Sequence, residues 1–255
     1  MILLAIDSAG ETCSAALWDQ ASPGPEGLLA FRMVEPARGQ AERLIELVEA
    51  VLADAGLRYD ALGAVAVNHG PGSFTGLRSA VAAARGLALA ADLGVLAVSS
   101  LEALAAGLRP DFSADLASGD VLSGEVLAAL DARRGEVYAQ CFGPDLRPLP
   151  GPLGAPRAMP PRAAAAFVVA EPLARPLRLV GSGARLIEAE LPTGVATVVE
   201  TVPVDARLVA LCAARRLAAG ERPVSGFAVR PLYLRAPDAR APVPLLARAR
   251  AVAAS

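Results

Sequence analysis

The 255-residue sequence contains no lysine, because all 24 of its basic residues are arginine. This absence excludes every site that needs a lysine ammonium, among them the P-loop for nucleotide phosphates, Schiff-base enzymes and Ser–Lys hydrolases. Histidine is nearly absent as well, since His69 is the only one. A metal site built on a histidine pair is therefore excluded, and a Ser–His–Asp triad would have to use His69 as its base.

Cysteines are few and long apolar runs are interrupted. Cys13, Cys141 and Cys212 lie far apart without a Cys-x-x-Cys motif, a spacing that indicates buried free thiols in a reducing compartment. Arg85 and Asp92 break the longest apolar region, so we expect no transmembrane helix. The start, MILLAIDSAG, has no basic region, so we expect no signal peptide. Together these features predict a cytoplasmic protein.

Apolar residues make up 54% of the chain, which is enough to bury a sizeable core. Much of this fraction is alanine, and only 4% of the chain is aromatic, so we expect helices packed closely on a sheet. The net charge of −2 supplies no general attraction to the phosphates of a nucleic acid.

The first hundred residues alternate between strand-like and helix-like segments. The helix-like segment Ala41–Leu52 carries its apolar residues on one face. The stretch from Val65 to Leu104 predicts a βαβ unit, and the whole order predicts a sheet covered by helices. The predicted strands are Ile2–Ile6, Cys13–Trp18, Leu28–Val34, one from Val65 and Gly94–Ser99, and a further helix begins at Ser100.

A Gly/Pro loop, Asn68–Gly76, lies at the centre of that βαβ unit. It lacks the lysine of a P-loop, and its Gly-x-Gly-x-x-x-Gly spacing is one residue longer than the dinucleotide fingerprint. A generic anion site made by the loop amides with Ser73, Thr75 and Arg78 stays open. The Ala-rich helix that follows is apolar nearly all round, which is typical of burial within its own domain or against another subunit; both alternatives stay open.

Two polar groups also allow two interpretations each. Asp7 and Ser8 end the first strand, where they either cap a turn or hold the metal of a nucleotide, as the acid at this place does in actin-like ATPases. The second group is a polar cluster on a predicted hairpin. It is either a solvated hairpin end with local salt bridges or part of a site, and its members are Asp131, Arg133, Glu136 and Tyr138.

The periodic apolar pattern ends after Leu104. The turn-rich segment 105–123 that follows predicts a crossover into a second domain. The last twenty residues, 236–255, are rich in Ala, Pro and Arg and predict a disordered tail. Between these segments we predict a hairpin at 126–142, a loop at 143–161, a helix at 163–170, a strand at 177–180, a helix from Pro203 to Gly220 and a β-like segment at 227–234.

Several motifs, in order from Met1 to about Arg235, resemble one known family. They are LLAIDSAGETCSAAL, GPGSFTGLRSAVAAARGLA, SSLEALA, ALDARRGEVYA, VGSGARLI and PLYLR. The chain resembles the TsaB (YeaZ) family, the dimerisation subunit of the bacterial machinery that makes threonylcarbamoyladenosine in tRNA. It departs from the family at Gln40, where members usually have histidine.

The resemblance implies an α/β fold of the actin-like ATPase (ASKHA, ribonuclease H-like) type with two related subdomains. The first would span residues 1–104 and be completed by the helix 204–220, and the second, smaller one would span 105–235. Family members look like degenerate relatives of the catalytic subunit TsaD. The resemblance therefore implies no cofactor and no metal in this chain.

The implied function is that of a non-catalytic scaffold that binds and stabilises TsaD. TsaD transfers threonylcarbamoyl from its adenylate to N6 of the adenosine beside the anticodon, in tRNAs that read codons starting with A. On this resemblance the chain is not an enzyme by itself but an essential subunit, together with the ATPase TsaE. It would be a homodimer when alone, and it would meet tRNA only through the complex.

The resemblance implies a partner interface, and the residues of the Gly loop and of the first strand end leave an anion or nucleotide site open. The expected dimer or partner interface is Leu44, Leu47, Val48, Val51, Leu77, Ala80, Val81, Ala84, Arg85 and Ala88. The expected vestigial anion or nucleotide site is Asp7, Ser8, Gly70, Gly72, Ser73, Thr75 and Arg78. The hairpin cluster of Asp131, Arg133, Glu136 and Tyr138 has no assigned role. Two enzyme functions stay open as alternatives, an actin-fold ATP-dependent phosphotransferase and a metallopeptidase.

Overall fold

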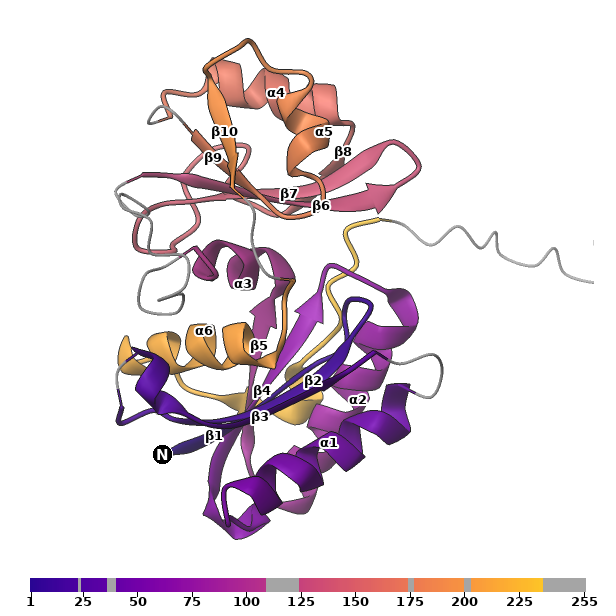
Figure 1. Ribbon diagram of the computed structural model, residues 1–255, viewed down its shortest axis with the longest axis vertical. Coiled ribbons are helices and arrows are strands. Elements are labelled where there is room, and N and C mark those ends of the chain that lie inside the picture. The colour runs from indigo at the N-terminus through magenta and orange to yellow at the C-terminus, as the bar shows by residue number, and fades with distance from the viewer. Residues whose placement is uncertain (23, 36–39, 109–123, 174–176, 200–202, 236–255) are drawn as a thin grey trace, which may run out of the picture.

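Two β-sheets stacked along the long axis organise the chain into two α/β lobes (Figure 1). The computed structural model describes residues 1–22, 24–35, 40–108, 124–173, 177–199 and 203–235. The predicted tail at 236–255 and most of the predicted crossover at 105–123 lie outside the described residues. We name the lobe around the six-stranded sheet lobe A and the lobe around the five-stranded sheet lobe B.

The sheet of lobe A has the strand order β11-β5-β4-β1-β2-β3. β1, β2 and β3 form an antiparallel meander, whereas β4 and β5 run parallel to β1. A central parallel set extended by an antiparallel meander is the ribonuclease H-like arrangement shared by actin-like folds, and it confirms the predicted fold class. The strands are β1 (Ile2–Asp7), β2 (Cys13–Asp19), β3 (Leu28–Val34), β4 (Leu62–Gly70), β5 (Gly94–Ser99) and β11 (Val224–Ser225).

Helices cover both faces of this sheet (Figure 1). Successive side chains of a strand point to opposite faces, so Leu4 and Ile6 join one core while Leu3 and Ala5 join the other. The first core packs under α1 (Gln40–Asp54) and α2 (Phe74–Ala90), and the second under α3 (Ser100–Ala106) and α6 (Ala206–Ala218). Short 3₁₀ turns occur at Gly24–Gly27, Tyr59–Ala61 and Gly226–Ala228.

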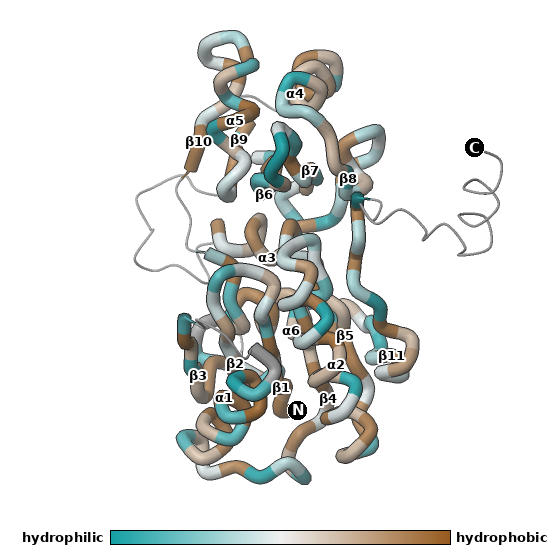
Figure 2. The backbone as a smooth tube through the Cα atoms, turned by 90° about the vertical axis from the view of Figure 1, so that its right-hand side faces the viewer, coloured by the Kyte–Doolittle hydropathy of each residue, from teal (hydrophilic) through white to brown (hydrophobic). Residues whose placement is uncertain are grey.

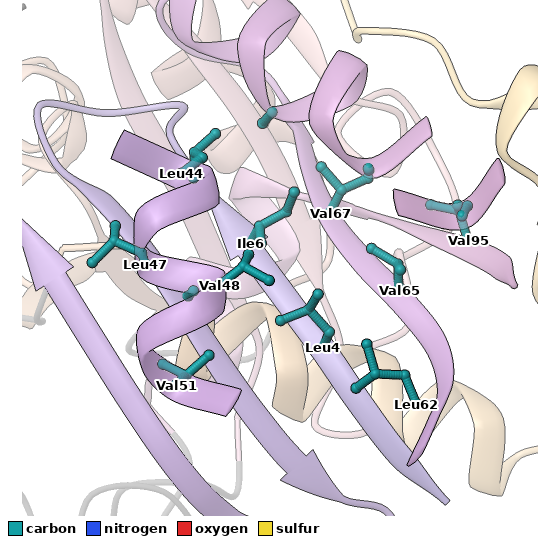
Figure 3. Packing of buried hydrophobic residues seen from close by; sticks show 14 of the residues in the cluster. Leu4, Ile6, Leu44, Leu47, Val48, Val51, Leu62, Val65, Val67 and Val95 are labelled. Carbon is teal, nitrogen blue, oxygen red and sulfur yellow. The ribbon is translucent and has the colours of Figure 1, made fainter. Parts of the chain in front are cut away.

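The apolar face of α1 points into lobe A (Figure 3). Val48 lies beside Ile6 of β1, and Leu44 and Val51 are fully buried in the same core. The amphipathic pattern of this helix is therefore used to hold it on the sheet.

Lobe B has the strand order β10-β9-β6-β7-β8. α4 (Pro161–Ala170) and α5 (Ala184–Glu188) cover its outer face, and α3 of lobe A covers the other. Leu101 and Leu104 of α3 share one buried cluster with Val126 and Phe142 of lobe B, so an apolar core joins the two lobes. The strands are β6 (Val126–Arg133), β7 (Glu136–Phe142), β8 (Arg157–Met159), β9 (Leu177–Val180) and β10 (Ala196–Val199).

Some predicted elements were wrong in detail. The predicted loop Asn68–Gly76 is shorter, because β4 continues to Gly70 through pairing with β5 and α2 begins at Phe74. The last predicted helix begins at Ala206 and not at Pro203, since the Asp205 carboxylate caps it by accepting from the Arg207 amide at 2.8 Å.

Three further differences lie in the second half of the chain. The segment 143–161, predicted as loop, contains β8, and α5 and β10 were not predicted. The predicted strand at 227–234 is wrong, because only Val224–Ser225 pairs with β5 and the chain then leaves the sheet. No helix of the described part is both long and apolar enough to span a membrane.

The same substitution should affect stability strongly on the buried side of α2 and weakly on its exposed side. Ala84 is fully buried against the sheet, whereas Ala82 is exposed. Ala84→Glu should lower the free energy of unfolding by about 3 kcal/mol or more, because it buries an unpaired charge, and Ala82→Glu should change it by less than about 0.5 kcal/mol. Urea denaturation followed by circular dichroism measures both values. Equal losses in the two variants would contradict this packing of α2.

Candidate functional site

Asp7 lies at the carboxyl end of β1 and is completely buried. Its Oδ1 accepts hydrogen bonds from Asn68 Nδ2 at 2.7 Å and from the Ala9 amide at 3.0 Å. Its Oδ2 is buried and has no hydrogen-bond partner among the described residues. Burial raises the pKa of Asp7 to about 7, against the lowering effect of the two hydrogen bonds and with a small further increase from Asp205.

Asn68 connects Asp7 to the next parallel strand. Its Oδ1 accepts from Ser100 Oγ at 2.8 Å and from the Gly70 amide at 3.0 Å, so both ends of the side-chain amide are used. Ligands of open α/β sheets bind beyond the carboxyl ends of the parallel strands, which is where these groups lie. Here, however, all three side chains are buried, and Asn68 is hydrogen-bonded to both Asp7 and Ser100.

The predicted anion site lies next to this cluster, at the start of α2. Ser73 caps the helix by accepting from the Gly76 amide at 3.3 Å, and its own amide donates to Ala9 O at 2.7 Å. Ser8 Oγ donates to Gly76 O at 2.8 Å. Two groups that an anion would need, the Ser73 amide and the Ser8 hydroxyl, are therefore used within the chain.

Gly72 allows the loop to approach the turn between β1 and β2. A Cβ atom at this position would lie 2.4 Å from Ala9 O, so a larger residue would force the two segments apart. Gly70, also predicted for the site, has φ of +116° and ends β4. The close approach explains the glycine at 72, and the positive φ explains the glycine at 70. The vestigial anion site remains a prediction.

Thr75 and Arg78 lie on the surface at the start of α2. Both are exposed, and the Arg78 guanidinium lies 5.0 Å from the centroid of the Phe74 ring. Phe74 also stacks on Tyr233 at 5.4 Å, and these two side chains are 59% and 49% exposed. We did not predict this aromatic pair. The signal for it was the single aromatic side chain of the helix, at its first position.

The residues predicted for the partner interface are, except for Arg85, buried in the core of lobe A. Side chains that already cover the sheet are not available to a partner, so this residue assignment needs correction. Arg85 is half-buried and donates to Val229 O. The sides of α1 and α2 that are open to a partner carry Ile45, Ala82, Gly86 and Leu89.

Three residues of the hairpin cluster take part in polar contacts, and the fourth packs on apolar residues. Asp131 Oδ1 accepts from the Arg133 amide at 2.7 Å, and Glu136 pairs with Arg235. Tyr138 packs on the apolar junction between the lobes. Asp131, Arg133 and Glu136 therefore share a set of polar contacts at the end of the hairpin, whereas Tyr138 lies at the apolar junction.

Neither reactive cysteine thiols nor a cluster of metal ligands occurs among the described residues. Burial raises the pKa of Cys13 to about 11 and that of Cys141 to about 12, so both are protonated thiols at neutral pH. Within the same ranges no three His, Cys, Asp or Glu side chains gather as metal ligands.

The pKa of Asp7 predicts a pH dependence of stability. A carboxyl group with a raised folded-state pKa binds its proton more tightly than the unfolded chain does. The free energy of unfolding should therefore fall by up to about 1.4 kcal/mol per pH unit as the pH rises from about 5 to about 7. Asp7→Asn should remove this slope and Asp60→Asn, on the surface, should keep it. Urea denaturation from pH 5 to pH 8 tests this, and equal slopes in both variants would refute it.

Comparison with known families identifies relatives over much of this chain. The profile of the family described as TsaD, tRNA N6-adenosine threonylcarbamoyltransferase, matches residues 35–144. The tRNA threonylcarbamoyladenosine biosynthesis protein TsaB of Escherichia coli is 38% identical over 138 residues, which are 54% of this chain and 53% of that protein. The protein of the same name from Bacillus subtilis is 33% identical over 142 residues. The chain thus spans about half the length of the curated relatives it matches.

Solved structures match nearly the whole chain. YeaZ from Pseudomonas aeruginosa has 31% identity and a TM-score of 0.66, with 91% of this chain and 99% of that chain covered. A second protein from that organism, described as similar to peptidase YeaZ, has 32% identity and a TM-score of 0.69, with 92% and 99% covered. Because sequence identity above 30% accompanies a shared fold over almost all of these two chains, the chain belongs to the TsaB/YeaZ family.

Proposed function

We propose that this chain acts in the biosynthesis of threonylcarbamoyladenosine in tRNA, as a non-catalytic subunit that binds a TsaD-like transferase. The observation that carries the proposal is the closed cluster of Asp7, Asn68 and Ser100. These polar groups lie where the fold binds ligands, yet they are buried and linked to one another through Asn68, and Asp7 Oδ2 alone among their oxygen atoms has no partner in the described part of the chain. Such an arrangement suits a family member that has kept the fold and given up the chemistry.

The partner surface that we propose is the exposed side of α1 and α2. Leu89 is 68% exposed, and Ile45 is exposed on the neighbouring helix. Ala82 and Gly86 are small and exposed, which would allow a second helix to approach closely. The TsaD profile matches residues 35–144, which include both helices. A TsaD-like partner would therefore bring a similar helix pair, and a second copy of this chain would bring the same pair in a homodimer.

A non-catalytic subunit would depend on other components for ATP hydrolysis and tRNA binding. A TsaE-like ATPase would supply ATP hydrolysis, and tRNA would be bound through the complex, because this chain has a net charge of −2. The chain would need no cofactor or metal of its own. It would work in the cytoplasm.

One observation favours a second function, an ATP-dependent phosphotransferase. The unpartnered Oδ2 of Asp7 lies at the place where actin-like ATPases hold the metal of a nucleotide. Calorimetry with Mg-ATP on the isolated chain decides between the two functions. Micromolar binding would favour the phosphotransferase.

Partner binding should depend on the exposed side of α2. Ala82→Glu, which should leave the fold intact, should weaken binding to the TsaD-like subunit about thirtyfold, because it places a charge in a helix contact. Leu186→Glu, at an exposed leucine of lobe B, is the matched control and should bind normally. Calorimetric titration of the two purified subunits measures both constants. Normal binding by Ala82→Glu would exclude this side of α2 as the interface.

Activity should require this chain without residing in it. Reconstitution with the TsaD-like and TsaE-like subunits, substrate and tRNA should yield modified adenosine only when this chain is present. The chain alone should yield none, because its polar cluster is closed. Mass spectrometry of the digested tRNA measures the product. Modification by the chain alone would overturn the non-catalytic role.

A further inference from the structure

Three sequence motifs without an assigned role meet at one point between the lobes. They are ALDARRGEVYA of the β6–β7 hairpin, VGSGARLI after β9, and PLYLR near the end of the described chain. The last belongs to a segment that we call the strap, residues 226–235. Figure 2 shows the strap leaving β11, passing along lobe A and reaching lobe B.

The strap is held on lobe A by backbone and aromatic contacts. The Leu232 amide donates to His69 O at 2.7 Å, and His69 Nδ1 lies 3.1 Å from Arg230 O. Tyr233 stacks on Phe74 at the start of α2. These contacts attach the strap to the end of β4 and to the exposed aromatic pair.

The end of the strap is held on lobe B by Arg235. Its Nε donates to a Glu136 carboxylate oxygen at 2.9 Å, and its Nη2 donates to the same carboxylate and, at 3.3 Å, to Arg133 O. The Arg235 and Glu136 side chains are only 26% and 34% exposed. One guanidinium thus bridges two acceptors of the hairpin in a partly shielded place.

The hairpin is shaped to present these two acceptors. The register of β6 and β7 shifts between Asp131 and Arg133, and Arg133 has φ of 62°, in the left-handed region. Asp131 Oδ1 holds the Arg133 amide at 2.7 Å, and the Asp131 amide donates to Ser182 Oγ at 3.0 Å. A non-glycine residue in this conformation is strained, so the contacts that hold Arg133 there call for a role.

We propose that the hairpin and the strap form a latch between the lobes, with Glu136 and Arg133 O as its acceptors and Arg235 as its donor. The latch is a second connection beside the apolar junction under α3. Through Tyr233 it also positions Phe74 at the exposed end of α2. This gives the Asp131–Tyr138 motif a role in positioning the strap. The proposal goes beyond the proposed function, because it concerns the chain by itself.

The strap depends on such contacts because it has little regular structure. After the 3₁₀ turn at Gly226–Ala228, residues 229–235 form no helix or strand. The position of the Leu232 amide therefore reports whether the latch is closed.

Hydrogen exchange of the whole chain, followed by NMR, tests the latch. Glu136→Gln should make the Leu232 amide exchange about fivefold faster, the factor expected of a partly exposed ion pair. The amide of Ala5 in β1 should be unchanged. Glu46→Gln, which breaks the exposed Arg43–Glu46 pair, is the matched control and should leave the Leu232 amide as it is.

Salt and a conservative variant separate a latch from general stabilisation. About 1 M salt screens the ion pair, so it should speed exchange of the Leu232 amide in the original chain and have little effect in Glu136→Gln. Arg235→Lys keeps the charge with one ammonium and should give an intermediate rate. The proposal fails if Glu136→Gln leaves the strap rate unchanged, or if all amides of lobe B accelerate equally. Since no TsaD-like subunit is present, this outcome is independent of the proposed function.

Discussion

The close contact between the turn after β1 and the start of α2 is the constraint on which the rest of lobe A depends. Gly72 permits it, because a side chain there would collide with Ala9 O. The contact seats α2 on the sheet with Leu77 and Ala84 buried. It also uses the Ser73 amide, so one geometric requirement explains both the burial of the helix and the closed anion site.

The same packing separates two uses of an apolar helix. The stripe of α2 that includes Ala80 and Ala84 stabilises the monomer, while the opposite side carries Ala82, Gly86 and Leu89. A helix that is apolar nearly all round has enough surface for both tasks. The exposed side of α2 is therefore available for the proposed partner contact.

The two lobes are joined by two contacts of different chemistry. Under α3 the contact is a buried apolar cluster, and at the strap it is an ion pair with two acceptors. Actin-like enzymes that close around a nucleotide need lobes with two stable arrangements. An apolar junction together with the proposed latch favours a single arrangement of the two lobes.

Local patterns in the sequence determined the strands Leu28–Val34, Gly94–Ser99 and Leu177–Val180 with the bounds that the structure has. The family motifs determined the fold class. Which side of α2 faces the sheet was decided only by tertiary structure, because a helix with apolar residues all round has no single periodic face. The same holds for Arg235 and Glu136, which lie 99 positions apart in the chain. Neither residue has a local pattern that names its partner, so only the folded arrangement of strap and hairpin could pair them.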